Sequence, residues 1–393
     1  MHTMYNLYFS IYFKKYRFKV VICTEFIETF SILQAMRRTF QQYLLFTLRS
    51  IIFWVFAFSF MIIVRYFGVF EEKGVSILPK YQLPLLHLLM YVSVAAVPFG
   101  IFYAFVEFLF DRFLAKNLAL GVIIFTKNFI YLVTLIFLVS FVVEYTGYML
   151  DVSIYEERGW WRTNKTFWSI MFFFVIASLI FSFIKIANEK FGRGVFLKML
   201  LGKYRKPQEE ERIFMFLDLK ASTTIAENLG HYTYSQLIQD CFYDLNTIVQ
   251  KYDAEIYQYV GDEAVLSWTY KRGIKRNNAV ALYFGFKEKL ASRSQHYQEK
   301  YDLIPEFKAG VHGGTLMVTE VGSVKKEIAY HGDVINTTAR IQSQCNTYNA
   351  NMLISESLLK EMQLPETYMT KNIDDLLLRG KAKTINIYSV LKE

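Results

Sequence analysis

The chain has 393 residues, of which 53% are hydrophobic, and it carries a formal net charge of +9. Residues 1–206 contain 23 Lys and Arg against 11 Asp and Glu, whereas the remainder contains 21 against 24. The basic excess accompanies the hydrophobic half, which indicates a lipid membrane as partner. It argues against a nucleic-acid partner, because nucleic-acid binding needs a basic patch on the soluble part.

Residues 1–42 are predicted to form a segment in the cytoplasm or on the membrane surface. The segment is apolar and aromatic but is broken by basic residues, and it lacks the small-residue cleavage site of a signal peptide. Two interpretations stay open. The first 35 residues form an amphipathic element on the membrane surface, or they are a non-native extension before a translation start at Met36.

Four apolar stretches are long enough to cross a bilayer core, which takes about 20 residues. They lie at about Tyr43–Val64, Leu83–Val106, Leu118–Val143 and Thr166–Ile184, within a predicted four-helix membrane domain over 43–187. Basic residues flank the first and last stretches, whereas acidic residues gather in the first and third connecting loops. This bias predicts an integral, multi-pass protein of the cytoplasmic or inner membrane, with both termini in the cytoplasm. Lys127, near the inner end of the third stretch, is expected to extend its ammonium to the membrane surface.

Residues 188–211 are predicted to connect the membrane domain to a soluble domain through a helix. Apolar side chains recur on one face at helical spacing, and Pro207 ends the pattern. The helix either lies on the inner leaflet, held by its basic residues, or transmits motions of the membrane domain to the soluble domain.

The soluble domain, over 212–393, alternates strands with helices. Strands are predicted at 213–217, 255–259, 264–268, 306–311, 315–319 and 326–330, and helices at 234–252, at 278–297 and after Gly332. The order β-α-β-β-α-β is the ferredoxin-like plan, in which the first strand lies beside the hairpin of the next two. The end of the first strand and the hairpin turn are therefore expected to meet.

Two carboxylates lie at that meeting point. Asp218 ends the first apolar strand, and Asp262 follows Gly261 at the hairpin turn. Carboxylates at strand ends suit a hard divalent cation, and Mg²⁺ usually arrives with the phosphates of a nucleotide. Each residue alone is weak evidence, because Asp at a strand end is commonly a cap and Gly-Asp is a common hairpin turn.

Three polar residues at or within predicted helices add to this pattern. Thr223 precedes the helix after Asp218, where hydroxyls and backbone amides bind phosphate, although the neighbouring run Thr224–Glu227 also fits a purely structural capping box. Asn336 and Arg340 are four residues apart and project from one helix face. That pair could instead merely tie its helix to the sheet.

Taken in order, the segments Arg212–Thr223, Ile256–Ser267 and His331–Arg340 resemble the catalytic domain of the class III nucleotidyl cyclases, the adenylate and guanylate cyclase family. The resemblance extends to about Val390. Together with the apolar stretches, it predicts an α-helical transmembrane domain followed by an α/β (α+β), ferredoxin-like class III cyclase catalytic domain.

The resemblance also implies a two-metal site. Asp218 and Asp262, helped by the backbone carbonyl of Leu219, would hold two Mg²⁺, with Mn²⁺ as an alternative ion. The metals would activate the ribose 3′-hydroxyl and bind the triphosphate, so that the hydroxyl attacks the α-phosphorus and pyrophosphate leaves. Asn336 would orient the ribose, and Arg340 would stabilise charge on the α-phosphate.

Three further positions follow from the resemblance as nucleotide-binding residues, in addition to Thr223. They are Arg379 for the triphosphate, and Gln258 and Ala329 at the positions where the family reads the base. The family usually has Lys at the first base position and Asp or Thr at the second. ATP is the expected substrate, because a glutamine amide offers the donor and acceptor that match the adenine edge.

Family sites are built across a dimer, with the metal-binding aspartates on one chain and the Asn and Arg on the other. A homodimer of this chain would therefore form two sites. The expected function is a membrane-bound adenylate cyclase that makes cyclic AMP for intracellular signalling. The alternatives are a cyclase for GTP or a pyrimidine nucleotide, and a catalytically silent membrane receptor of the same fold.

Overall fold

A computed structural model describes residues 40, 43–67, 84–110, 119–150, 162, 165–191, 195–376 and 384–392. The chain divides into two compact units, Met1–Ile186 and Ala187–Glu393, and each is described by itself. Apart from residue 40, the predicted N-terminal segment lies outside the described residues, and so does Arg379.

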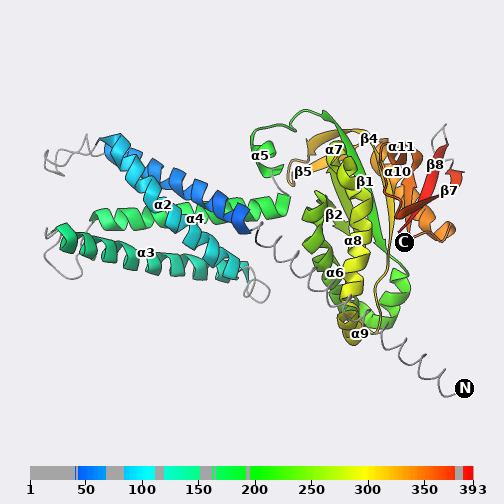
Figure 1. The fold of residues 1–393 in the computed structure, drawn as a ribbon, viewed down its shortest axis with the longest axis horizontal. Helices are drawn as coiled ribbons and strands as arrows, with labels where there is room; N and C mark the ends of the chain where they lie inside the picture. The colour runs from blue at the N-terminus through cyan, green and yellow to red at the C-terminus, as the bar shows by residue number, and fades with distance from the viewer. Residues whose placement is uncertain are drawn as a thin grey trace, which may run out of the picture. The chain divides into compact units, whose positions relative to one another are not determined.

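The first unit consists of apolar helices (Figure 1). They are the helix Tyr43–Phe67, α2 (Leu85–Leu109), α3 (Leu120–Leu150) and α4 (Lys165–Phe191). In the part of the chain that the structure describes, three helices are long and apolar enough to cross a membrane, at Tyr43–Phe67, Leu85–Leu109 and Phe167–Asn188. Within the described residues α3 contributes the shorter apolar stretch Gly121–Phe137, so the third of the four predicted spans stays a prediction.

Aromatic packing holds these helices together. Trp54 is fully buried and stacks on Phe174 of α4, with ring centroids 5.0 Å apart. Phe99 of α2 meets the same indole edge-on at 4.8 Å. A Cβ added to Gly100 would lie 2.7 Å from the Cα of Ile51, so this glycine allows α2 to approach the first helix closely.

Glu107 of α2 forms a buried charge cluster with two other helices. Its Oε2 accepts hydrogen bonds from Lys127 of α3 at 2.8 Å and from Lys185 of α4 at 2.7 Å, and its Oε1 accepts one from Tyr131 at 3.2 Å. The Lys127 side chain is only 7% exposed, so the expectation that it extends to the membrane surface was wrong. Pairing with Glu107 removes the cost that would drive an isolated ammonium to the surface.

In the second unit the short helix α5 (Val195–Leu200) follows the end of α4, and Tyr204 then fixes the connector to the sheet. The Tyr204 side chain is buried, and its hydroxyl donates a hydrogen bond to Glu210 at 3.1 Å. Its carbonyl accepts a hydrogen bond from the backbone N–H of Glu320 at 2.9 Å. The connector is therefore packed as part of the second unit over these residues.

One mixed sheet forms the centre of this unit (Figure 1). Its strands are β1 (Gln208–Leu219), β2 (Glu255–Val260), β3 (Glu263–Thr269), β4 (Phe307–Val321), β5 (Glu327–His331), β6 (Met352–Ser355), β7 (Tyr368–Leu376) and β8 (Ile385–Lys392). The helices are α6 (Ser222–Val249), α7 (Tyr270–Ile274), α8 (Asn278–Ser292), α9 (Ser294–Tyr301), α10 (Asp333–Thr347) and α11 (Glu356–Lys360). The order β2-β3-β1-β4-β6-β8-β7, with β5 paired to β4, confirms the ferredoxin-like plan, because β1 lies beside the β2–β3 hairpin.

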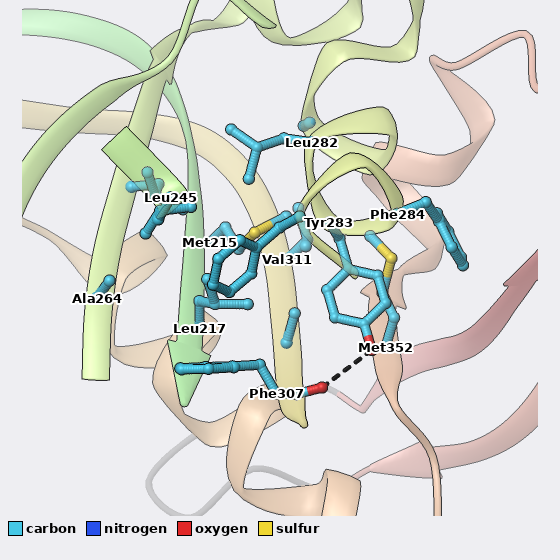
Figure 2. Packing of buried hydrophobic residues seen from close by; sticks show 14 of the residues in the cluster. Met215, Leu217, Leu245, Ala264, Leu282, Tyr283, Phe284, Phe307, Val311 and Met352 are labelled. Carbon is cyan, nitrogen blue, oxygen red and sulfur yellow. Dashed lines mark hydrogen bonds between the residues drawn. The ribbon is translucent and has the colours of Figure 1, made fainter. Parts of the chain in front are cut away.

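The two faces of β1 bury different cores. Met215 and Leu217 pack beneath α6 and α8, where Figure 2 shows them with Leu245 and Leu282. Phe214, on the opposite face, packs in a second cluster that includes residues of β4 and α10. Because side chains alternate along a strand, Asp218 shares the face of Phe214.

The strand β4 is continuous, although two strands were predicted on either side of Gly313 and Gly314. A Cβ at Gly313 would lie 2.9 Å from the Ile213 side chain, and one at Gly314 would lie 3.0 Å from Val334. These glycines therefore permit close packing on both faces of the sheet, and they do not form a turn.

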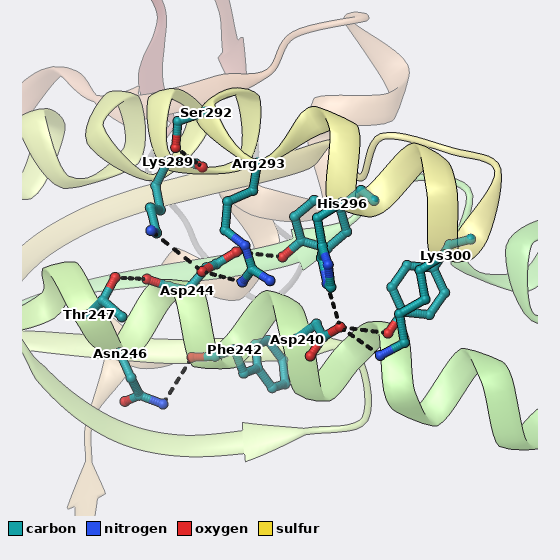
Figure 3. A network of polar contacts seen from close by, with 12 residues as sticks. Asp240, Phe242, Asp244, Asn246, Thr247, Lys289, Ser292, Arg293, His296 and Lys300 are labelled. Atoms are coloured by element: carbon teal, nitrogen blue, oxygen red, sulfur yellow. Dashed lines mark hydrogen bonds and ion pairs between the residues drawn. The ribbon is translucent and has the colours of Figure 1, made fainter. Parts of the chain in front are cut away.

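Charged contacts fix α6, the helix that follows Asp218 (Figure 3). The fully buried Asp244 accepts hydrogen bonds from Arg293 and from Tyr297, each at 2.7 Å. One turn earlier, Asp240 lies 3.0 Å from His296 Nε2. Burial opposes ionisation here, but hydrogen bonds, that of His296 first among them, lower the pKa of Asp240 to about 2. The segment spanning the end of α8 and α9 thus holds α6 in place.

Candidate active site

Asp218 and Asp262 lie at one end of the sheet, as the sequence predicts. Asp218 pairs with Glu263 in the β1–β3 ladder, and Asp262 immediately precedes Glu263 after a turn in which Gly261 has a φ of 61°. Burial raises the pKa of Asp218, and the negative charge of Asp262 adds to that rise. The two carboxylates therefore interact at this edge of the sheet.

Glu263 is a third carboxylate here, and the sequence analysis did not single it out. Burial, followed by the charges of Asp218 and Asp262, raises the pKa of Glu263 to about 7. Three carboxyl groups thus lie close together in a partly buried place, and a bound cation would offset their mutual repulsion. The signal available in the sequence was its position beside Asp262 at the start of a strand.

The residues present fit a magnesium site that a substrate completes. Among the described residues, no three His, Cys, Asp or Glu side chains are arranged to hold a metal ion. Mg²⁺ is commonly bound through one or two carboxylates, with water and phosphate oxygens filling the other positions. Leu219 is the last residue of β1 and its side chain is buried, so its backbone is the part able to contribute.

The turn after β1 presents the start of α6. Ala221 adopts a left-handed conformation with φ 53°, α6 begins at Ser222, and Thr223 is exposed in the first turn. No side chain caps this helix end, so its first N–H groups can meet an anion. The alternative capping box starting at Thr224 was wrong, because the helix begins two residues earlier.

Replacing Ala221 with glycine is expected to stabilise the protein by about 0.5–1 kcal/mol, because the left-handed conformation costs alanine more than the extra chain entropy costs glycine. Chemical denaturation of the two proteins, followed by circular dichroism, measures this difference. An unchanged or lower midpoint for Ala221→Gly would show that the turn is unstrained.

Asn336 and Arg340 lie on one face of α10, but that face does not meet the carboxylates of the same chain. Asn336 is exposed and Arg340 is half-buried, while Thr337 and Ile341 are buried. Gln342, which donates a hydrogen bond to Asp218, is two residues beyond Arg340. Two residues correspond to about 200° around a helix, so Arg340 projects away from its own Asp218.

The two base-position residues lie on strands that contact each other. Gln258 on β2 is exposed, and it pairs with Val265, which belongs to the cluster on the Asp218 face. Ala329 lies on β5, where the ring of the adjacent Tyr330 is 4.8 Å from that of Tyr257, the residue before Gln258. The structure thus brings β2 and β5 together at these rings, but Ile328 and Tyr330 both pack in that cluster, so the side chain of Ala329 between them faces the other way.

Lys308 and Gln342 contact Asp218 directly, and neither was predicted from the sequence. Lys308 is opposite Asp218 in the β1–β4 ladder, and its Nζ lies 3.1 Å from Asp218 Oδ2. Gln342 Nε2 donates to the same oxygen at 3.0 Å. Both are at least 90 residues from Asp218 along the chain, so no local pattern indicates the contacts.

Residues 205–392 match the sequence model of the adenylate and guanylate cyclase catalytic domain. The match covers 188 of the 393 residues. The chain is 34% identical over 208 residues to adenylate cyclase 2 of Rhizobium meliloti (strain 1021), a match that covers 53% of this chain and 57% of that protein.

A second relative is the adenylate cyclase of Anabaena cylindrica, which is 23% identical over 180 residues and matches 45% of this chain and 36% of its own length. The chain thus spans less than two thirds of either curated relative. Among solved structures, the adenylyl cyclase CyaB from P. aeruginosa has a TM-score of 0.43 and 18% identity, covering 48% of this chain and 97% of that chain.

The cyclase domain is expected to lose stability as the pH rises towards neutrality when metal is absent. The pKa of Glu263 is about 7 in the folded protein and near its ordinary 4.5 when unfolded. Its contribution to the free energy of unfolding is therefore fully present below about pH 4.5, and it is lost as the pH rises through 7. After allowance for partial exposure, Glu263→Gln should remove about 1–2 kcal/mol of this dependence.

The measurement is the melting temperature of both proteins in EDTA at pH 5 and pH 8. The parent protein should show the larger decrease between the two pH values. Equal decreases would mean that Glu263 ionises normally in the folded domain.

Proposed function

We propose that this chain is a membrane-bound adenylate cyclase that converts ATP to 3′,5′-cyclic AMP and pyrophosphate for intracellular signalling. The observation that carries the proposal is the convergence of Asp218 with the Asp262 turn at one sheet end of a cyclase domain. The adenylate cyclase relatives support ATP as the substrate.

Asp218 and Asp262, with the carbonyl of Leu219, would hold two Mg²⁺. When bound, these ions would lower the pKa of the ribose 3′-hydroxyl and neutralise charge on the triphosphate. Thr223 and the first N–H groups of α6 would bind phosphate oxygens, because that helix end is open.

Asn336 would orient the ribose, and Arg340 would stabilise the charge that develops on the α-phosphate. Arg379 would bind the triphosphate. The direction of Arg340, away from Asp218 of its own chain, favours a homodimer in which each site takes its aspartates from one chain and its Asn336 and Arg340 from the other. Such a dimer is symmetric and carries two sites.

The four predicted spans, three of which are long apolar helices in the described part of the chain, would anchor this enzyme in the membrane. The basic residues that flank the first and last predicted spans support a topology with both termini and the cyclase domain in the cytoplasm. The test of the function is a cyclisation assay of the full chain in lipid nanodiscs, with each of ATP, GTP, CTP and UTP and with Mg²⁺ or Mn²⁺. Cyclic AMP is the expected main product, and preference for another nucleotide, or no product with any, would contradict the proposal.

Gln258 is expected to read the base, since it is exposed on the Asp218 face of β2 beside the metal-binding turn. In Gln258→Glu the carboxylate accepts hydrogen bonds from guanine N1 and N2 but offers no donor to adenine. The ratio of kcat/KM for ATP to that for GTP should fall by about ten- to two-hundred-fold. Both nucleotides are assayed with the same metal, and a ratio within twofold of the parent value would place base selection elsewhere.

A further inference from the structure

Gln342 is buried between α10 and the metal-binding edge of the sheet. Its side-chain amide donates a hydrogen bond to Asp218 Oδ2 at 3.0 Å, and the residue is only 7% exposed. Lys308 Nζ contacts the same oxygen at 3.1 Å and also donates to Asn346 Oδ1 of α10 at 3.1 Å. Two neighbouring elements therefore hold one oxygen of the carboxylate.

The backbone beneath Gln342 is fixed by an unusually close approach of α10 to β4. A Cβ added to Gly310 would lie 2.3 Å from the Gln342 nitrogen and 2.5 Å from its Cα. Only glycine accommodates this contact, so the distance from α10 to the sheet is set by the backbones. The Gln342 amide therefore reaches Asp218 from a rigid support.

We propose that Gln342 is a positioning residue for the metal ligand Asp218. Both of these contacts fall on Oδ2, so they set the plane of the carboxylate and leave its second oxygen, Oδ1, to face a metal ion. A neutral amide orients the carboxylate without adding positive charge, unlike Lys308, which also repels a cation. This inference rests on the proposed two-metal function.

The first test compares Gln342→Met with Gln344→Met in the full chain. Gln344 is on the same helix but half-exposed and two residues further along, so it controls for the loss of an amide from α10. Mn²⁺ binding is measured by electron paramagnetic resonance in the presence of 3′-deoxy-ATP, which cannot cyclise. Gln342→Met should weaken Mn²⁺ binding by about tenfold or more, as losses of outer contacts to metal ligands do, and Gln344→Met by less than twofold.

Kinetics supply a second measure. In Gln342→Met the half-saturating Mg²⁺ concentration should rise, while saturating Mn²⁺ restores most of kcat, because the ligand is misplaced but still present. Mn²⁺ affinity within twofold of the parent protein, with both variants folded, would overturn the proposal. Because this binding measurement needs no turnover, it decides the role of Gln342 even if the cyclase activity itself fails to appear.

A mixed dimer shows whether Gln342 acts on Asp218 or only stabilises α10, because Gln342→Met can be placed on either chain. One chain carries Asp218→Asn and the other carries Arg340→Ala, so the single intact site takes Asp218 from the second chain and Arg340 from the first. Gln342→Met should raise the Mg²⁺ requirement when it is on the chain that supplies Asp218, and have little effect on the other chain. Equal effects in both placements would mean that Gln342 only supports the helix.

Discussion

Asp218→Asn and Asp262→Ala are each expected to reduce cyclic AMP production by the full chain by about 10²–10³-fold, the usual loss when one charge-stabilising group is removed from an active site. A tenfold loss is the smallest that the metal assignment allows. A two-metal site loses its function when one of the two shared carboxylates is removed, because neither ion is then held in the geometry that the reaction requires. The measurement is initial rates at saturating ATP, with Mg²⁺ and with Mn²⁺.

The choice of asparagine at position 218 follows from the structure. Lys308 is only 8% exposed and its ammonium contacts Asp218 Oδ2. Alanine there would leave that buried ammonium without its partner, at a cost of about 3–5 kcal/mol, and the resulting loss of folded protein would be confused with a loss of catalysis. Asparagine keeps an oxygen that accepts from Lys308 and from Gln342.

Asp302→Asn is the control, since Asp302 is an exposed residue at the end of α9 and takes no part in the site. All three variants should keep the melting temperature of the parent protein within a few degrees. Activity above a tenth of the parent value in Asp218→Asn or Asp262→Ala would falsify the metal assignment.

Mixing two inactive chains is expected to restore activity. Asp218→Asn removes a metal ligand, and Arg340→Ala removes the charge stabiliser, which projects from α10 away from Asp218 of its own chain. In a heterodimer of the two variants, one composite site has both groups intact and the other has neither. Random exchange in a symmetric dimer makes half of the dimers mixed, so about a quarter of the parent activity should return.

Exchange of chains is verified by tagging the two variants differently and purifying the mixed dimer through both tags. A mixture of Asp218→Asn with Asp262→Ala is the matched control, because both lesions fall on the same half of the site and no intact site forms. If the Asp218→Asn and Arg340→Ala pair recovers nothing although mixed dimers are present, then each site is built within one chain.

The pattern of residues was sufficient to predict that β1 lies beside the β2–β3 hairpin and to single out the two aspartates. The apolar run before Asp218 and the hairpin at Gly261 and Asp262 are local signals, and the β-α-β-β-α-β order allows few arrangements of the strands. The alternation of side chains along β1 then decides which face Asp218 shares with Phe214. These features depend on neighbours in the chain, so they can be read from it directly.

The contacts that surround those aspartates depended on the packing of distant elements. Gln342 reaches Asp218 because Gly310 lets α10 approach β4, and Lys308 meets it through the register of β1 with β4. In the first unit, Glu107 gathers lysines from two other helices, contrary to the expectation for Lys127. Periodicity shows which face of an element is buried. Which residue pairs with a buried charge depends on the relative translation and register of the two packed elements, and these are set only in the tertiary structure.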